Sequence, residues 1–312
     1  MRFNPSPSPI SSRPIFQSLQ PRTLVRLAFS FHAFVVALSA ISGHAESPVA
    51  DQPETNYETI ASGPVRVSLD PKMGGRIASF TFAGKEVLRT QRDENHWHWG
   101  STVWTSPQSD WGWPPIATFD QMPFSVVRSD GEQVELASDV DPKTQLQMTK
   151  NMRFEPSPDD GLPILIATYT LTNRGNENRA VAIWENTRVR WSGVVSIPVG
   201  GTYRLSNQQA PIETRSQDGQ MRITLDDSQP DAQKIFYTPA SDQPLTKVTY
   251  RVDGLTLTKT HTTPERVAPD QSPLEIYLAP KDGFAELEIQ SQYHDLAADD
   301  SASMRVQWSL RP

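Results

Sequence analysis

The chain has 312 residues, of which 29 are basic and 36 are acidic, and it contains no cysteine. Its formal net charge of −7 at pH 7 does not suit a nucleic-acid partner, because nucleic-acid binding depends on neutralising phosphates. An anionic lipid surface is excluded for the same reason. Without cysteine there are no disulfides and no thiol chemistry, and a chain of this length can bury enough apolar surface to fold without cross-links.

Residues 1–45 have the composition of a secretory signal peptide. They contain four arginines and no acidic residue, then an apolar stretch from Leu27 to Ile41, and then small residues at Gly43 and Ala45. A basic region, an apolar region and a small-x-small cleavage site in this order predict export. The apolar stretch of fifteen residues is shorter than the roughly 20 that a membrane-spanning helix needs. We therefore expect a periplasmic or secreted protein with no membrane span in its mature chain.

Cleavage would remove the four arginines and leave 25 basic against 36 acidic residues, a net charge of −11. Residues 46–59 are polar and contain proline, which predicts a flexible leader. Residues 60–312 contain no linker that would divide them, and single all-β units of about 200 to 250 residues are common. The sequence thus predicts one domain over residues 60–312.

Short runs of alternating apolar and polar residues, separated by turn residues, extend from Pro64 to the C-terminus and are typical of antiparallel β-structure. The predicted strands lie at residues 65–69, 77–82, 86–88, 124–127, 134–137, 146–154, 164–172, 180–191, 221–225, 247–252, 255–260, 274–278, 284–290 and 304–310. No helix of three turns and no repeat of fixed period is expected. The pattern predicts an all-β fold with two large, mostly antiparallel sheets.

Five of the eight tryptophans lie within seventeen residues, between Trp97 and Trp113. Polar residues separate the rings, so the segment lacks the uninterrupted apolar pattern of a core strand. The nearby Gly112, Pro114 and Pro115 disfavour regular structure. Flat aromatic faces beside hydrogen-bonding groups suit a sugar. The segment therefore predicts a carbohydrate-binding loop.

Within this loop, Trp104, Trp111 and Trp113 are the rings that we expect to contact a ligand. Trp97 and Trp99 are two residues apart, which would place them on one face of a strand, and we expect both to belong to the core. The alternative, that these rings only close one end of the sandwich, stays open.

Hydroxyl groups of a sugar need polar partners, and four residues are candidates. Gln108, Asp110 and Asn186 offer amide and carboxylate groups in or near the predicted sites. Arg76 directly follows two glycines, and its guanidinium could bind sugar hydroxyls or a uronate carboxylate. A tight hairpin would explain the glycines equally well.

Acid–base chemistry would require a proton-transferring pair. His98 is adjacent to the predicted sugar loop, and histidine exchanges protons near neutral pH; a loop histidine without function is the alternative. Glu185 lies among apolar strand neighbours, so it is either buried or directed into a cleft. Glu286 and Glu288 share one face of a strand, which faces either water or the cavity. The catalytic candidates are thus His98, Glu185 and Glu288.

No metal and no cofactor are predicted. A pair such as His96 and His98 could begin a zinc site, but no third ligand and no His-Glu-x-x-His motif is evident. Glycine-rich phosphate loops and nucleophile elbows are absent as well.

Several motifs occur in an order that is found in one known family. They are residues 74–77 and 84–88 near the start, 169–173 and 182–186 in the middle, and 284–289 and 304–308 at the end. In this order they resemble the galactose-mutarotase-like domains of the aldose 1-epimerase superfamily. The tryptophan-rich segment is most similar to an uncharacterised branch of that superfamily.

The resemblance implies a β-supersandwich whose concave sheet holds a carbohydrate. Aldose 1-epimerases of this family open the sugar ring with a histidine as general acid and a glutamate as general base. This chain lacks the family's Asn-x-x-His-Gly-Gly segment, and it has Trp184, Glu185 and Asn186 where a second histidine is expected.

Three functions follow from these observations. The first is an exported protein that binds a mono- or oligosaccharide in a cleft lined by the tryptophan-rich loop. The second is an aldose 1-epimerase or related sugar-modifying enzyme, in which His98 acts with Glu185 or Glu288. The third is a structural envelope protein whose aromatic residues serve packing or a partner protein.

Overall fold

The computed structural model describes residues 56–92, 97–206, 214–227 and 231–312. The predicted signal peptide at residues 1–45 lies outside the described residues, as does most of the predicted leader. Strand β1 (Glu58–Ser62) includes the last two residues of that leader. The leader prediction is therefore wrong for Glu58 and Thr59, which pair with β2 in register.

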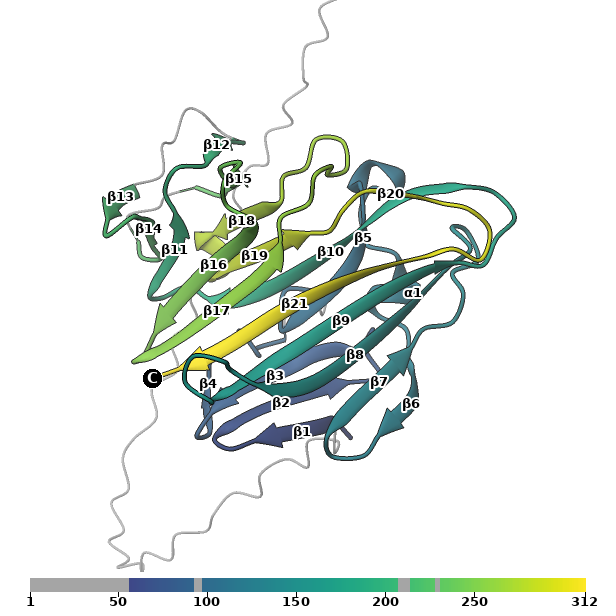
Figure 1. Cartoon of the computed structure of the whole chain (residues 1–312), viewed down its shortest axis with the longest axis horizontal. Coiled ribbons are helices and arrows are strands. Elements are labelled where there is room, and N and C mark those ends of the chain that lie inside the picture. Colours follow the sequence, from purple (N-terminus) through teal and green to yellow (C-terminus); the bar gives the residue numbers. More distant parts are fainter. Residues whose placement is uncertain (1–55, 93–96, 207–213, 228–230) are drawn as a thin grey trace, which may run out of the picture. The chain divides into compact units, whose positions relative to one another are not determined.

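Two large antiparallel sheets make up the described residues (Figure 1). The first sheet has the order β1, β2 (Val65–Asp70), β3 (Arg76–Phe82), β5 (Ser101–Ser106), β10 (Arg179–Arg190), β19 (Phe284–Gln290), β18 (Leu274–Ala279), β15 (Gln233–Thr238) and β12 (Thr202–Leu205). Two short strands join it at the side: β4 (Lys85–Glu86) pairs with β3, and β20 (His294–Leu296) pairs with β10.

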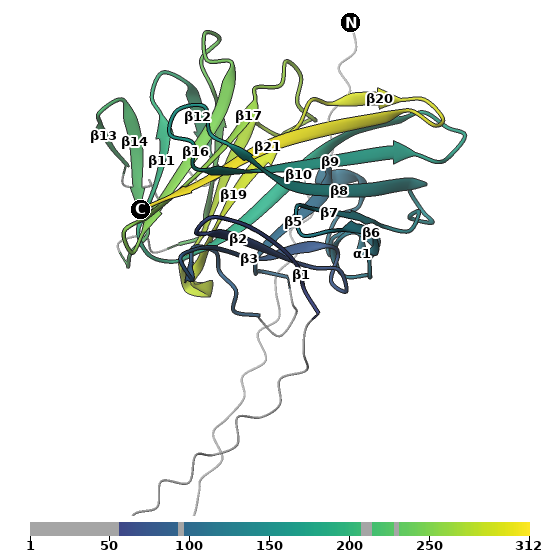
Figure 2. The ribbon, with the colours of Figure 1, turned by 60° about the horizontal axis from the view of Figure 1, so that its bottom comes forward.

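The second sheet has the order β13 (Thr214–Gln217), β14 (Gln220–Thr224), β11 (Val194–Pro198), β16 (Leu245–Val252), β17 (Leu255–Thr262), β21 (Ser301–Arg311), β9 (Pro163–Asn173), β8 (Leu146–Pro156), β7 (Gln133–Ala137) and β6 (Ser125–Ser129). In Figure 2, β8 and β9 of this sheet lie above β2 and β3 of the first. The helical elements of the described ranges are short: η1 (Gln108–Asp110), α1 (Ala117–Asp120) and η2 (Pro280–Asp282). The predicted all-β sandwich is thus confirmed.

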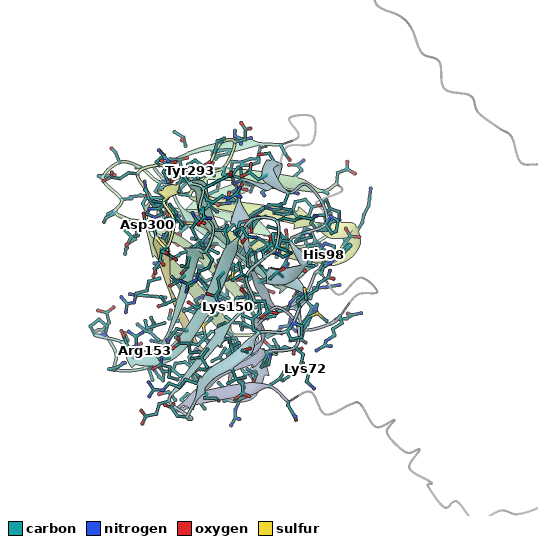
Figure 3. All side chains as sticks on the ribbon, turned by 90° about the vertical axis from the view of Figure 1, so that its right-hand side faces the viewer. Lys72, His98, Lys150, Arg153, Tyr293 and Asp300 are labelled. Carbon is teal, nitrogen blue, oxygen red and sulfur yellow. The ribbon has the colours of Figure 1, made fainter. Side chains whose placement is uncertain are left out.

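The core lies between the two sheets and is built from the inward-facing side chains of both. Trp308 on β21 packs edge-on against Phe80 on β3, with ring centroids 5.6 Å apart. Charged residues are buried in this layer too: Lys150 on β8 is 1% exposed and donates to the carbonyl of Gly74 at 2.7 Å. Figure 3 shows Lys150 among packed side chains, whereas Lys72 lies at the surface.

The strand expected at Trp97 and Trp99 does not form, because the chain turns at Gly100 before β5 begins. Gly100 has a φ of +60°, and a Cβ there would lie 2.3 Å from the carbonyl oxygen of Ile77. Only glycine fits such a left-handed, close-packed position. Trp99 is nevertheless buried as expected, at 1% exposure, whereas Trp97 is half-buried.

Candidate functional site

Strand β10 runs through the middle of the first sheet and divides its side chains between two environments. Trp184, Asn186 and Arg188 alternate with Glu185 and Thr187, so the two sets lie on opposite faces of the sheet. Glu185 and Thr187 face the second sheet, because both contact Lys259 of β17. The other three therefore face away from the core of the sandwich.

Neighbouring strands bring their own side chains to this outer face. On β5, Thr102 lies opposite Asn186, and Trp104 lies opposite Trp184. On β19, Glu286 pairs in register with Arg188, and Glu288 pairs with Asn186. The sheet thereby gathers aromatic and charged groups on one surface.

A cavity of about 330 Å³ opens on this face, and we call it the tryptophan cavity. It is lined by His98, Trp104, Gln108, Trp113, Trp184, Lys234, Tyr277, Glu286 and Glu288. Five of these residues were predicted from the sequence as ligand-binding or catalytic: His98, Trp104, Gln108, Trp113 and Glu288.

The three indole rings of the cavity meet edge to face. Trp104 lies 5.2 Å from Trp184 at an interplanar angle of 84°, and 6.2 Å from Trp113 at 85°. Trp104 and Trp184 are buried, whereas Trp113 is 52% exposed. Each buried ring is fixed by its N–H, because Trp104 donates to Asp120 Oδ1 and Trp184 to Glu288 Oε2, both at 2.8 Å. Trp113 is therefore the ring with a large accessible face.

Arg76 does not line the cavity. It is fully buried, and its guanidinium forms an ion pair with Asp120 at 3.1 Å and donates to the carbonyls of Trp97 and Trp99. Because Asp120 also accepts the N–H of Trp104, Arg76 positions that ring indirectly. The predicted contact between Arg76 and a ligand is therefore not supported by its location.

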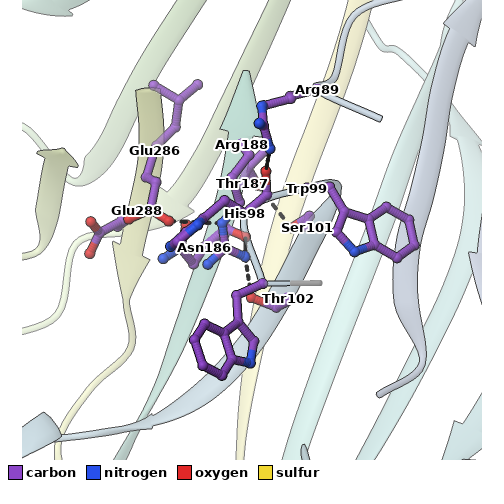
Figure 4. Close-up of polar contacts among 12 residues, drawn as sticks. Arg89, His98, Trp99, Ser101, Thr102, Asn186, Thr187, Arg188, Glu286 and Glu288 are labelled. Atoms are coloured by element: carbon purple, nitrogen blue, oxygen red, sulfur yellow. Dashed lines mark hydrogen bonds and ion pairs between the residues drawn. The ribbon is translucent and has the colours of Figure 1, made fainter. Parts of the chain in front are cut away.

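A second arginine stands directly behind the cavity wall. Arg188 donates to Glu286 Oε1 at 2.8 Å and to Thr102 Oγ1 at 2.5 Å, as Figure 4 shows. Its guanidinium also lies 4.9 Å from the centre of the Trp104 ring, within cation–π distance. Glu286 is consequently held in place while its side chain stays 10% exposed.

Lys234 on β15 bridges two buried carboxylates. Its Nζ lies 2.6 Å from Glu275 Oε2 and 2.9 Å from Glu288 Oε2. Burial is the main reason that the pKa of Glu288 rises to about 8, and the negative charges of Glu275 and Glu286 add to it, although Lys234 opposes the rise. Burial lowers the pKa of Lys234, but the two carboxylates outweigh it and raise that pKa above its ordinary value. Burial thus favours the protonated form of Glu288, whereas the ion pair with Lys234 favours the carboxylate.

His98 lies in the loop that precedes β5, and it forms one side of the same cavity. Its ring stacks on Phe284 at a centroid distance of 4.8 Å, and it is nearly parallel to the Trp113 ring at 6.3 Å. Arg89 donates to its carbonyl oxygen, as drawn in Figure 4. The structure therefore brings His98 and Glu288 to one cavity.

Glu185 is on the other side of the sheet and does not reach the cavity. It forms an ion pair with Lys259 at 2.5 Å, and both side chains are fully buried between the sheets. Ser101 and Thr187 also donate to its carboxylate. Of the two alternatives for Glu185, the structure shows burial rather than exposure in a cleft, so this predicted catalytic residue lies apart from the tryptophan cavity.

The remaining predicted ligand-binding residues lie outside the lining of the tryptophan cavity. Trp111 and Asp110 line a neighbouring cavity, and the Trp111 N–H donates to the carbonyl of Thr105 at 3.0 Å. Asn186 is fully buried beside Glu288 in the register, and neither its amide oxygen nor its amide nitrogen has a hydrogen-bond partner among the described residues. The sequence analysis missed Trp184, Lys234 and Tyr277.

Within the described ranges, no group of three or more His, Cys, Asp or Glu side chains is placed to hold a metal ion. The same part of the chain contains no helix with the length and apolar character for crossing a membrane.

Comparison with known proteins gives one family and a set of similar folds. A family model described as a domain of unknown function (DUF4380) matches residues 58–311. No curated protein matches the chain. Galactose mutarotase-like and aldose 1-epimerase structures have the same fold.

Three solved structures illustrate the similarity. A galactose mutarotase-like protein from Lactobacillus casei ATCC 334 is 12% identical, with a TM-score of 0.55 over 82% of this chain and 100% of that chain. The Slr1438 protein from Synechocystis sp. PCC 6803 is 14% identical, with a TM-score of 0.55 over 88% and 99%. A galactose mutarotase related enzyme from Lactobacillus acidophilus is 12% identical, with a TM-score of 0.53 over 82% and 97%. The predicted resemblance to this fold is thus confirmed.

Proposed function

The chain belongs to the DUF4380 family, and we propose that it binds a carbohydrate in the tryptophan cavity. The observation that carries the proposal is the meeting of three indole rings with Lys234, Glu286 and Glu288 around one opening. The fold supports the proposal as well, because galactose-mutarotase-like structures share it.

The physical chemistry of the cavity fits a sugar ring. A pyranose has apolar C–H faces and a rim of hydroxyls, so it needs a flat apolar partner and several fixed polar ones. Trp113 offers the flat partner with 52% of its surface exposed. Gln108, Lys234 and Glu286 offer donors and acceptors in the same wall. The volume of about 330 Å³ lies at the low end of the roughly 300–1,000 Å³ range of small-molecule sites, which favours one sugar unit.

Export is part of the proposal. The basic and apolar composition of residues 1–45 supports a periplasmic or extracellular location, where free and polymeric sugars are encountered. Fractionation of cells that produce the full chain tests it, and recovery of the intact chain in the cytoplasm alone would contradict it.

Titration with a panel of mono- and oligosaccharides is expected to change the tryptophan fluorescence in a saturable way. Replacing Trp113 with alanine should weaken the affinity roughly tenfold or more, equivalent to about 1.4 kcal/mol, because the accessible stacking face is lost. The thermal midpoint should barely change, since the ring is half outside the fold.

Tyr203→Ala is the matched control, because Tyr203 is 54% exposed and does not line the cavity. It should leave the affinity unchanged. If no sugar in the panel produces saturable quenching, or if Trp113→Ala binds as tightly as the unaltered protein, carbohydrate binding at this site is disproved.

Aldose 1-epimerase activity is a second candidate, and one observation favours it. His98 and Glu288 line the same cavity, and burial raises the pKa of Glu288, which favours the protonated form that a general acid needs. In such a reaction, His98 would accept the proton of the anomeric hydroxyl while Glu288 protonates the ring oxygen. The C–O ring bond breaks, and the reverse steps close the ring on the other face.

Polarimetry on freshly dissolved glucose and galactose tests this second candidate. If it is correct, Glu288→Gln should reduce the rate by about 10²–10⁴, the usual contribution of general acid–base catalysis, while sugar binding persists. A protein that binds sugar but does not accelerate anomer exchange over buffer would leave binding as its function.

A further inference from the structure

A second, larger cavity adjoins the tryptophan cavity, and it differs from it in chemistry. Its volume is about 840 Å³, and Trp113 lines both cavities. We call it the proline cavity, after Pro114, Pro115 and Pro142 in its wall. A ligand seated against Trp113 in the first cavity can therefore extend past the same ring into the second.

The walls of the proline cavity are mainly apolar. Besides the three prolines and two indole rings, the lining includes Ile116, Ala117, Met122 and Val140. Met122 and Val140 are 45% and 38% exposed, so both present apolar surface to a ligand in this cavity.

The buried polar side chains of this wall are occupied with one another. Asp141 Oδ2 accepts the hydroxyl of Thr118 at 2.9 Å, and Asp141 Oδ1 accepts the hydroxyl of Thr144 at 2.8 Å. Two backbone N–H groups, of Lys143 and Thr144, donate to the same carboxylate. These groups are already paired, so they are poorly placed to recognise the hydroxyls of a second sugar.

Three other charged residues of this lining are exposed, namely Asp110, Asp139 and Lys143. They are solvated, as the polar margin of an apolar site is in general. In the tryptophan cavity, by contrast, Glu288 and Glu286 are buried or nearly so and lie among the rings. The first cavity is built for polar recognition, and the second for apolar contact.

We propose that the ligand is a glycoside whose sugar ring occupies the tryptophan cavity and whose apolar aglycone lies in the proline cavity, across Trp113. This inference rests on the proposed function, because it assigns the sugar to the tryptophan cavity. It adds the ligand class: an alkyl or aryl glycoside rather than a free sugar or a longer glycan. Because a glycoside has no free anomeric hydroxyl, the inference applies to the binding function and not to the epimerase candidate.

The test compares methyl, n-butyl and n-octyl glycosides of the hexose that binds best in the sugar panel, each below its micelle concentration. Every buried methylene is worth roughly a fourfold gain in affinity. The n-octyl glycoside should therefore bind at least about tenfold more tightly than the methyl glycoside. The corresponding disaccharide serves as the glycan probe and should bind no more tightly than the methyl glycoside.

The double variant Met122→Gln/Val140→Asn should keep the affinity for the methyl glycoside and lose most of the n-octyl gain. Both positions are partly exposed, so the fold should tolerate the changes. Val127→Asn is the control, because Val127 is 58% exposed and lies outside both cavities; it should retain the gain.

The outcomes separate the two proposals. If the methyl glycoside binds but the n-octyl compound gains nothing, or gains equally in the double variant, the aglycone site is wrong while sugar binding stands. A disaccharide that gains affinity instead would overturn it in favour of a glycan chain. If no glycoside and no free sugar binds, the proposed function itself fails.

Discussion

Replacing Lys259 with methionine is expected to lower the free energy of unfolding by about 3–5 kcal/mol, the usual cost of removing one partner of a buried ion pair. Lys259 is fully buried and lies 2.5 Å from Glu185, and it also donates to Thr187 at 2.7 Å. Methionine would fill much of the space but leave the Glu185 carboxylate without its ion-pair partner in a medium of low polarity. Urea denaturation followed by tryptophan fluorescence measures the change.

Lys247→Met provides the matched control, since Lys247 is exposed on β16, and its loss should cost less than about 0.5 kcal/mol. The double variant Lys259→Met/Glu185→Leu should recover a large part of the lost stability, because it removes both charges together. A single Lys259→Met variant as stable as the control would show that this ion pair is not what balances the buried carboxylate.

The second large effect concerns Glu288 and pH. Its pKa is about 8 in the folded protein against an ordinary value of 4.5. Between these values the folded protein binds a proton that the unfolded chain does not, so folding stability falls as the pH rises from about 5 to about 8. Each pH unit in this range lowers the stability by at most about 1.4 kcal/mol for this carboxyl.

Glu288→Gln should abolish this part of the pH dependence, because glutamine does not titrate. Urea denaturation at intervals from pH 5 to pH 8.5 should show the variant gaining stability relative to the unaltered protein as the pH rises, with no further relative gain above pH 8. Glu132→Gln, in an exposed hairpin, is the control and should follow the unaltered protein. Parallel curves for Glu288→Gln and the unaltered protein would mean that Glu288 is ionised throughout this range.

Most of the fold could be predicted from local sequence. The long predicted strands at residues 164–172 and 180–191 correspond to β9 and β10, and the predicted strands at residues 124–127 and 134–137 correspond to the paired strands β6 and β7. Strand β5 could not be found in this way. Its sequence is rich in Ser and Thr, and all six residues are buried, so no alternation of exposed and buried positions marks it.

The candidate site was predictable in part, for the same physical reason. The aromatic loop gave Trp104 and Trp113, and strand alternation gave Glu288, because these signals are local. The sequence did not indicate Lys234 as a site residue, because β15 was not predicted and the partners of Lys234, Glu275 and Glu288, lie far along the chain. Arg76 was misplaced because its partner Asp120 is 44 residues away. Pairing of buried charges is a property of the tertiary structure, and a single sequence does not contain it.

The order of strands in the first sheet also determines when the tryptophan cavity can form during folding. The floor of the tryptophan cavity needs β5, β10 and β19 side by side, although residues 101–106 and 284–290 lie far apart along the chain. Pairings between such distant segments form late and slowly. A nascent or truncated chain without β19 therefore lacks the complete cavity. A ligand that binds the cavity would stabilise the completely folded molecule relative to partly folded ones.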